Sequence, residues 1–485
     1  MKSLAKDTAI YGLSSIIGRF LNYLLVPLYT YKISAASGGY GVITNLYAYT
    51  ALLFVILTYG METTFFRFAN KEDENPKLVF STILRMVGLT SVLFVALVVA
   101  FIGPVSSAMG YADHPSYVWT MAAVVALDAF QAILFCYLRY QHRPIKFAAL
   151  KLLFIGLNIG LNLVFFLLLP KVVPGWEIQV GHVFYINLFC TGIITFFFWK
   201  ELKGIGYGFD KDLARRLLSY GWPILVLGIA GILNQTADKM LFPKIYPGED
   251  ATAQLGIYGA CAKIAMIMAM ITQAFRYAYE PFVFGNSREK DSRETYALGM
   301  KYFVIFTLLA FLAVMAYMNI LRYIIRSDYW EGLRVVPIVM AAEIMMGVYF
   351  NLSFWYKLTD RTIWGAVFSG IGCAVLIGVN IAFVPRYGYM ACAWGGVAGY
   401  GIAMVLSYFV GQKHYPIRYP MLQMGAYLVL AAVLFAGISW ANAHLGFWPA
   451  LLVNTALVGV FAAYILWKDL PLASLKTAVL SKIRR

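Results

Sequence analysis

Charged side chains inside long apolar stretches are the residues of this sequence best placed to do chemistry. Five are cationic and three are acidic: Arg19, Arg85, Lys151, Lys239 and Lys263, with Asp128, Asp238 and Glu343. A charge at the centre of a bilayer costs about 3 kcal/mol on insertion scales, so such a group normally faces a cavity or an opposite charge. The excess of cations suits an anionic ligand, and the three carboxylates are candidate sites for binding H+ or Na+.

Simpler roles compete with a ligand site for five of these groups. Arg85 and Lys151 lie one or two turns inside their apolar stretches, where a long side chain can reach the lipid headgroups. For those two residues we favour the headgroup interpretation. Arg19, Lys263 and Asp128 are equally compatible with a cavity and with pairing between helices.

Two close pairs of opposite charges have different spacings. Asp238 and Lys239 are adjacent, so we expect them to point to different faces of their helix and not to neutralise each other. Arg276 and Glu280 are four residues apart at the end of an apolar stretch, a spacing at which they can pair along one helix. Arg276 is also a further candidate for contact with an anionic headgroup.

No spacing typical of an enzyme or a metal centre accompanies these charges. The sequence contains no GxxxxGK[ST] phosphate loop, no GxSxG elbow and no HExxH metal pair. The five cysteines lie inside apolar stretches without metal-binding spacing, so we interpret them as packing residues. We therefore predict no catalytic residues, no metal site, no cofactor and no ATP-driven pump.

The elements that carry these charges are long and apolar. Hydrophobic residues make up 61% of the 485-residue chain and charged residues only 13%, against about 45–50% and about 25% in soluble domains. A soluble fold could not cover its surface with so few charges, whereas a bilayer requires no such cover. The sequence therefore predicts an all-α, polytopic membrane protein.

Fourteen stretches of the sequence are long and apolar enough to cross the hydrocarbon core, which takes about 20 residues of helix. The predicted spans are residues 8–33, 42–61, 78–103, 117–138, 147–169, 181–200, 217–243, 255–279, 297–321, 333–352, 363–384, 389–410, 421–442 and 447–467. The longest connection, at about residues 280–296, is too short for a separate domain. We therefore expect the function to lie inside the bilayer.

The distribution of basic residues predicts the orientation, because loops rich in Lys and Arg face the cytoplasm. Outside the predicted spans, 25 of these residues lie on the side of both termini and five on the opposite side. This bias explains most of the net charge of +16, so we expect no nucleic acid as a partner. We expect both termini in the cytoplasm and an uncleaved first helix.

An internal repeat relates the two halves of the chain. Segments separated by 216 or 218 residues match as follows: 24–29 with 240–246, 39–41 with 257–259, Arg143 with Arg361, and Asn162 with Asn380. The repeat unit holds six helices, so its copies enter the membrane from the same side and form two lobes around a central cavity, an arrangement suited to alternating access. We predict an N-lobe at residues 1–200, a C-lobe at 201–410, and two further helices with a basic cytoplasmic tail at 411–485.

Small residues and prolines within the spans predict local geometry. Close helix packing is expected at two pairs spaced four apart, Gly156 with Gly160 and Gly395 with Gly399. Bends are expected where prolines interrupt helices, at Pro27, Pro223 and Pro337.

Several short motifs follow one another in an order typical of one transporter family. They are Val26-Pro27-Leu28-Tyr29, Gly39-Tyr40-Gly41, the run Tyr59–Phe68, the polar run Asn234–Lys239, Gly256–Lys263, Glu280-Pro281, and Asn380 followed by Pro385 and Gly388. In these features the chain resembles the polysaccharide-type (oligosaccharide) flippases of the multidrug/oligosaccharidyl-lipid/polysaccharide exporter superfamily. It departs from that family's pattern at Lys239, where the family carries Arg.

This resemblance implies a flippase that moves an undecaprenyl-diphosphate-linked oligosaccharide from the cytoplasmic to the outer leaflet of the bacterial inner membrane. Its product would be a surface polysaccharide such as O-antigen, lipopolysaccharide or exopolysaccharide, and its partners would be the lipid-linked oligosaccharide, membrane lipids, and the polymerase or glycosyltransferases of the same pathway. Arg19 and Lys263 would hold the diphosphate, with Lys239, Arg85 and Arg276 extending the anionic site. Polar side chains available to sugars are Asn158, Asn162, Asn234, Gln235 and Gln273.

Three alternatives stay open. One is a multidrug exporter of the same superfamily that exchanges cationic drugs for H+ or Na+, and a second is a flippase for lipid II, the peptidoglycan precursor. A membrane glycosyltransferase or polymerase is less compatible, because no long extramembrane loop is present. Outward export of an anion runs electrically downhill by about 2.3 kcal/mol per charge at 100 mV, so coupling through Asp128, Asp238 or Glu343 is possible without being required.

Overall fold

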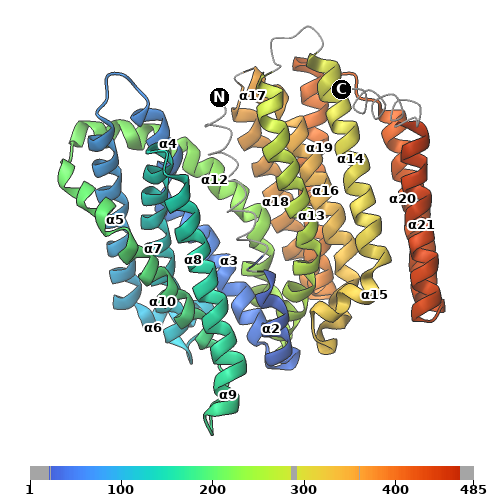
Figure 1. Cartoon of the computed structure of the whole chain (residues 1–485), viewed down its shortest axis with the longest axis horizontal. Coiled ribbons are helices and arrows are strands. Elements are labelled where there is room, and N and C mark those ends of the chain that lie inside the picture. Colours follow the sequence, from blue (N-terminus) through green and yellow to red (C-terminus); the bar gives the residue numbers. More distant parts are fainter. Residues whose placement is uncertain (1–20, 22, 286–291, 360, 470–485) are drawn as a thin grey trace, which may run out of the picture. The chain divides into compact units, whose positions relative to one another are not determined.

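The computed structural model describes residue 21 and residues 23–285, 292–359 and 361–469. These residues are helical almost throughout, and no strand occurs among them (Figure 1). Twelve helices are long and apolar enough to cross a membrane, and α10 (Gly181–Phe197) is a shorter apolar helix. Together they match all the predicted spans except the first, which lies largely outside the described residues. The all-α membrane-spanning class is confirmed, and the total of fourteen spans stays a prediction.

The chain forms two compact units. Unit 1 comprises residues 1–260 and 365–399, and unit 2 comprises residues 261–364 and 400–485. Helices α13 (Ala251–Gly285), α18 (Ile363–Tyr387) and α19 (Tyr389–His414) contribute to both units. The predicted lobe boundaries concern the sequence repeat and stay a prediction.

Unit 1 is built mainly from consecutive helices. They are α2 (Leu25–Lys32), α3 (Gly39–Thr58), α4 (Met61–Ala69), α5 (Pro76–Ala100), α6 (Ile102–Met109), α7 (Pro115–Tyr140), α8 (Pro144–Leu163), α9 (Leu169–Val172), α10, α11 (Trp199–Leu202) and α12 (Lys211–Ile245). Capping sets two of their starts: the Asn75 side chain accepts from the Lys77 amide at α5, and Asp210 accepts from two amides at α12. The core joins α4, α5 and α7, with the rings of Phe80 and Tyr137 stacked 3.8 Å apart.

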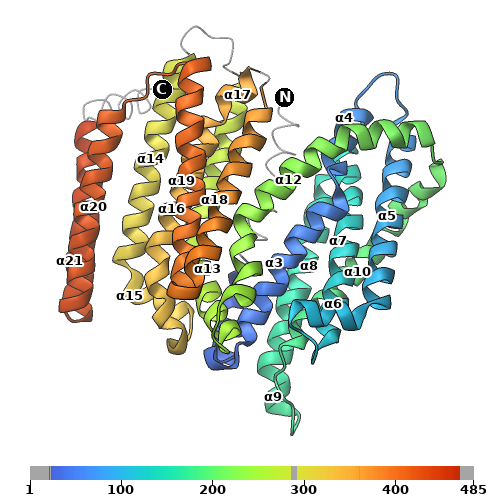
Figure 2. The same ribbon diagram turned by 180° about the vertical axis from the view of Figure 1, so that it is seen from behind.

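The predicted span at 42–61 is interrupted where α3 ends and α4 begins. Tyr59 and Gly60 adopt left-handed conformations, with φ of 32° and 75°. The break allows the chain to approach α12 closely, because a Cβ at Gly60 would lie 2.8 Å from the carbonyl oxygen of Gly221. Figure 2 shows α3 running alongside α12. The α3–α4 segment therefore bends around α12 and is not one straight helix.

Helix α3 also crosses the beginning of α13 at glycines. A Cβ at Gly41 would overlap the carbonyl oxygen of Thr252, and one at Gly256 would lie 2.9 Å from the Gly41 nitrogen. One turn further along, Gly259 faces Thr44. Gly41 and Gly259 are matched positions of the predicted sequence repeat, and each lies against a different residue of the other helix.

The other glycine and proline predictions have mixed outcomes. Close packing is confirmed for Gly395 and Gly399, whose added Cβ atoms would lie 2.7 Å from Asn380 Oδ1 and 2.8 Å from the Gly372 carbonyl oxygen. Among the described residues it is wrong for Gly156 and Gly160, because none of them lies within 4 Å of the added atom. Pro337 does not interrupt a helix but occupies the first turn of α16 (Val336–Leu352), where the missing N–H costs nothing. Pro223 does lie inside α12, as expected.

Unit 2 contains most of α13 and the helices α14 (Ser292–Ala316), α15 (Met318–Leu321), α16, α17 (Phe354–Leu358), α20 (Met421–His444) and α21 (Phe447–Lys468). A buried ion pair joins the last two helices to α14. Lys301 of α14 pairs with Asp469, directly after α21, and Tyr427 of α20 donates its hydroxyl to the same carboxylate. The Lys301 and Asp469 side chains are only 8% and 7% exposed.

Candidate functional site

Asp238 and Lys239 form an ion pair on α12, which contradicts the expectation that their side chains point apart. Lys239 Nζ lies 3.0 Å from Asp238 Oδ1, and it also donates to the carbonyl oxygen of Gln235. The Tyr258 hydroxyl donates to Asp238 Oδ2 at 2.7 Å. The flexible lysine stem folds back along the helix, so adjacent positions can neutralise each other. This carboxylate is buried and already occupied by protein partners.

The backbone next to this pair is tied to α3. Asn45 donates its amide to the carbonyl oxygen of Lys239 at 2.7 Å, and the Tyr111 hydroxyl donates to Asn45 Oδ1 at 2.7 Å. Buried polar groups must find partners when water is absent, so these bonds fix the position of the Asp238–Lys239 pair against α3.

Most of the amides predicted to contact sugars bond to protein instead. Asn162 donates to Asn158 Oδ1 at 2.7 Å and accepts from the Tyr29 hydroxyl at 2.9 Å. Asn234 is buried and donates to the carbonyl oxygen of Ser369 at 2.9 Å. Of the five predicted amides, Gln235 is exposed, whereas Gln273 is half-buried on α13.

Asp128 and Lys151 lie together inside unit 1. Lys151 Nζ lies 4.0 Å from the centre of the Phe135 ring, and its charge interacts with the Asp128 carboxylate. Asp128 also faces the Thr191 hydroxyl. This placement differs from the headgroup interpretation of Lys151, because its ammonium group is directed toward the protein. For Asp128 it favours pairing between helices, the second of the two roles considered from the sequence.

Three further ion pairs of unit 1 join residues that are far apart in the sequence. Glu62 of α4 lies 3.6 Å from Arg139 of α7. Glu201 is buried, and its carboxylate contacts Lys146 at 2.6 Å and Arg143 at 3.4 Å. These contacts hold the ends of α4, α7, α8 and α11 together. They involve three cationic side chains and two carboxylates.

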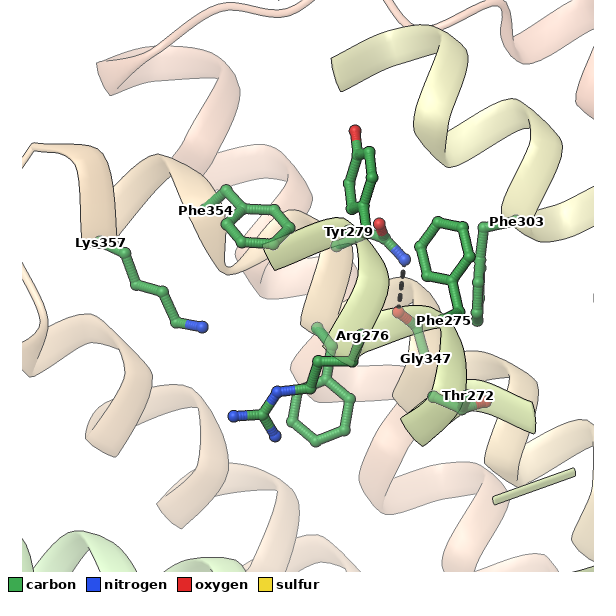
Figure 3. A pocket seen from close by; sticks show the side chains of 10 residues that line it. Thr272, Phe275, Arg276, Tyr279, Phe303, Gly347, Phe354 and Lys357 are labelled. Atoms are coloured by element: carbon green, nitrogen blue, oxygen red, sulfur yellow. Dashed lines mark hydrogen bonds between the residues drawn. The ribbon is translucent and has the colours of Figure 1, made fainter. Parts of the chain in front are cut away.

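A pocket in unit 2 brings two cations together over aromatic rings (Figure 3). It is lined by Thr272, Phe275, Arg276, Tyr279, Phe303, Gly347, Phe350, Asn351, Phe354 and Lys357, none of which is acidic. The Arg276 guanidinium lies 4.9 Å from the centre of the Phe350 ring, and Lys357 Nζ lies 5.2 Å from that of Phe354. Figure 3 shows both cationic groups extending toward the same open side of the pocket.

Within the described part of the chain, two buried polar atoms of this pocket have no hydrogen-bond partner. They are the hydroxyl of Thr272 and Oδ1 of Asn351, whose amide nitrogen donates to the carbonyl oxygen of Gly347 at 3.0 Å. An unpaired buried polar atom costs about 1–3 kcal/mol, so each is a site where a ligand hydroxyl would gain a bond. The pocket thus combines two cations with aromatic rings and two buried polar groups, around a free volume of about 10 Å³.

The structure brings only part of the predicted site together. Arg276 lies in the pocket, whereas Arg19 falls outside the described residues. Four predicted residues are half-buried elsewhere and do not line this pocket: Arg85 on α5, Lys263 and Gln273 on α13, and Glu343 on α16. In the described part of the chain, no group of three or more metal-ligating side chains occurs.

Sequence reasoning missed Lys357, which lies between the predicted spans at 333–352 and 363–384. A detectable signal was present, because Phe350, Phe354 and Lys357 are spaced four and three residues apart and so share one helix face.

The chain matches the model of one protein family over residues 4–278, more than half its length, and that family is described as polysaccharide biosynthesis protein. No curated protein sequence matches this chain.

Solved structures with this fold include several transporters. The lipid II flippase MurJ, in an inward closed conformation, superposes with a TM-score of 0.73 at 14% identity and covers 94% of this chain and 98% of its own. An inward-facing multidrug resistance MATE family transporter of the MOP superfamily gives 0.60 at 15% identity, covering 84% and 94%. A MOP superfamily transporter from Pyrococcus furiosus, whose binding pocket has reverse polarity, gives 0.55 at 14% identity, covering 84% and 95%. At these identities the likeness concerns the fold alone.

Proposed function

Because the chain belongs to the polysaccharide biosynthesis protein family, we propose that it is a flippase that transfers a polyprenyl-diphosphate-linked oligosaccharide from the cytoplasmic to the outer leaflet. The family and the MurJ-like and MATE-like fold support a membrane transporter of this superfamily. The lipid-linked oligosaccharide, and the surface polysaccharide made from it, are the proposal.

The observation that supports this substrate is the pocket of Arg276 and Lys357. A diphosphate carries closely spaced negative charges, and charge-assisted hydrogen bonds to Arg and Lys are about twice as strong as neutral ones. The rings of Phe350, Phe354 and Tyr279 suit the apolar faces of sugars, and the unpaired atoms of Thr272 and Asn351 suit their hydroxyls. Arg276 and Lys357 lie on elements that we predict to end at the cytoplasmic face, where such a substrate would be loaded.

Arg19 and Lys263 remain proposed contacts for the diphosphate at a later stage of transfer, with Arg85 and Lys239 as further cations. Lys239 is already paired with Asp238, so it would contribute only if that pair opened. The membrane potential would drive an anion outward, and Asp128, Asp238 or Glu343 could add coupling to H+ or Na+. A glycan polymerase or glycosyltransferases of the same pathway are the proposed partners in the cell, with both termini in the cytoplasm.

The test is a flipping assay in proteoliposomes with a fluorescent diphosphate-linked oligosaccharide. A lost charge-assisted bond costs about 1.5–3 kcal/mol, so we expect Arg276→Gln and Lys357→Gln each to slow transfer by about tenfold or more. The matched control is Lys413→Gln, an exposed cation outside the pocket. Equal rates for all three variants and the unmodified protein would refute the pocket as a substrate site.

Lipid II is a second candidate substrate, supported by the fold shared with the lipid II flippase MurJ. It has the same diphosphate chemistry, so competition between lipid II and other diphosphate-linked glycans in this assay would identify the preferred sugar. A multidrug exporter would instead move cationic dyes, which two pocket cations should repel. Dye transport that is unaffected by Arg276→Gln would favour that alternative.

A further inference from the structure

An apolar groove lies between α18 and α19 on unit 1. Its walls are two stripes at helical spacing: Val379, Phe383 and Tyr387 on α18, and Met390, Ala391, Trp394, Val397 and Ala398 on α19. The groove has a volume of about 610 Å³. Phe383, Tyr387 and Trp394 are 48%, 60% and 55% exposed, so large rings stand out on both sides of it.

The packing of the two helices explains the shape. On their contact side, Gly395 and Gly399 let α19 approach Asn380 and Gly372 of α18 closely. Gly388, with φ of 57°, makes the sharp turn between the helices. Because small residues lie at the contact and large ones away from it, a channel remains between the two stripes.

A cation marks one end of this groove. Arg386 is exposed and lies three residues after Phe383 and seven after Val379, which places it on the same face of α18. Among the described residues, no ion pair or hydrogen bond to its guanidinium is found. It is also one of the few basic residues on the side that we predict to face outward, where charge is not explained by the cytoplasmic bias.

We propose that this groove binds one anionic phospholipid of the outer leaflet, with its acyl chains between the α18 and α19 stripes and its phosphate at Arg386. The stripe from Val379 to Tyr387 is about 12 Å long at 1.5 Å per residue. One leaflet accounts for about half of a hydrocarbon core of roughly 30 Å, so acyl chains of ordinary length match the groove. A polyprenyl tail is much longer than the groove, which favours a phospholipid over the lipid of the proposed substrate.

Native mass spectrometry of the purified full-length protein tests this site without any transport measurement. The probes are phosphatidylglycerol, phosphatidylcholine with the same acyl chains, and polyprenyl phosphate, each added at equal concentration. We expect one phosphatidylglycerol to be retained about tenfold more strongly than phosphatidylcholine. Arg386→Gln should abolish this preference, and Ala398→Phe, which fills the groove, should lower the retention of both phospholipids.

Matched controls separate the site from general lipid contact. Lys171→Gln removes another exposed cation predicted to face outward, and Val433→Phe enlarges an exposed residue of α20. Neither control substitution should change the retention of the two phospholipids. In a second measurement, phosphatidylglycerol with brominated chains should quench the tryptophan fluorescence of the unmodified protein. The quenching should be weaker in Trp394→Phe, which lacks the tryptophan of the groove.

Three outcomes would overturn the proposal. Equal retention of the two phospholipids by the unmodified protein would mean unspecific lipid contact. A preference that survives Arg386→Gln would place the phosphate elsewhere. Stronger retention of polyprenyl phosphate, lost in Ala398→Phe, would assign the groove to the substrate tail. None of these results depends on whether the protein is a flippase, so failure here is distinguishable from failure of the proposed function.

Discussion

Replacing Lys301 with Met should destabilise the attachment of α20 and α21 to α14. The Lys301 and Asp469 side chains are almost completely buried, and Tyr427 shares the carboxylate. Removing one partner of a buried ion pair leaves an uncompensated charge, which typically costs 3–5 kcal/mol. We therefore expect Lys301→Met to lower the free energy of unfolding by about that amount. Tyr427→Phe should cost less, about 1.5–3 kcal/mol, because it removes one hydrogen bond to a charged group.

A double variant distinguishes the loss of a charge from the loss of packing. Lys301→Met combined with Asp469→Leu removes both charges, and replacing a whole buried pair by apolar groups is often neutral. The double variant should therefore recover most of the stability that Lys301→Met loses. The assay is unfolding in mixed micelles titrated with SDS, followed by circular dichroism. A loss below about 1 kcal/mol in Lys301→Met, or no recovery in the double variant, would refute the reasoning.

The same pair predicts a dependence on pH. Burial alone would raise the pKa of Asp469, but hydrogen bonds from Lys301 and Tyr427 and the charge of Lys301 outweigh it, so the pKa lies below its usual value. A carboxyl with a lowered folded-state pKa stabilises the protein above its unfolded pKa of about 3.9, and this contribution is lost as the pH falls further. The stability difference between the unmodified protein and Asp469→Leu should thus be constant near neutral pH and shrink below about pH 4.

Four further substitutions test contacts inside unit 1. Gly41→Leu should prevent the α3–α13 crossing and abolish the yield of folded protein. Gly156→Leu should not lower the free energy of unfolding, because no described residue lies within 4 Å of its Cβ. Equal yields of the two variants would contradict this. Tyr29→Phe removes a buried hydrogen bond and should cost about 1–3 kcal/mol in the SDS titration. Lys239→Met leaves Asp238 buried without its cation and should cost about 3–5 kcal/mol, and an unchanged midpoint would argue against the pair.

The sequence predicted the spans well because each depends only on local apolar length. It predicted side-chain partners poorly because they depend on which helices meet. Glu62 and Arg139 are 77 positions apart, and no local pattern connects them. Gly156–Gly160 and Gly395–Gly399 have the same spacing, yet among the described residues the second pair alone lies against another helix.

The candidate site shows the same limit. Arg276 is identified by its place in an apolar stretch, whereas Lys357 lies between two predicted spans, where basic residues are common on the cytoplasmic side. Only the packing of α13 against α16 and α17 places both at one pocket. Likewise, the adjacent positions of Asp238 and Lys239 predicted separation, but a lysine side chain is long enough to fold back.

The crossing of α3 and α13 limits how the beginnings of these two helices can move. Gly41 lies against the backbone of α13 at Thr252 and Gly256, and Gly259 lies against Thr44 of α3. Because backbone meets backbone with no side chain between, neither helix can turn about its own axis without bringing a bulkier residue into the contact. The beginnings of α3 and α13 should therefore move as one piece.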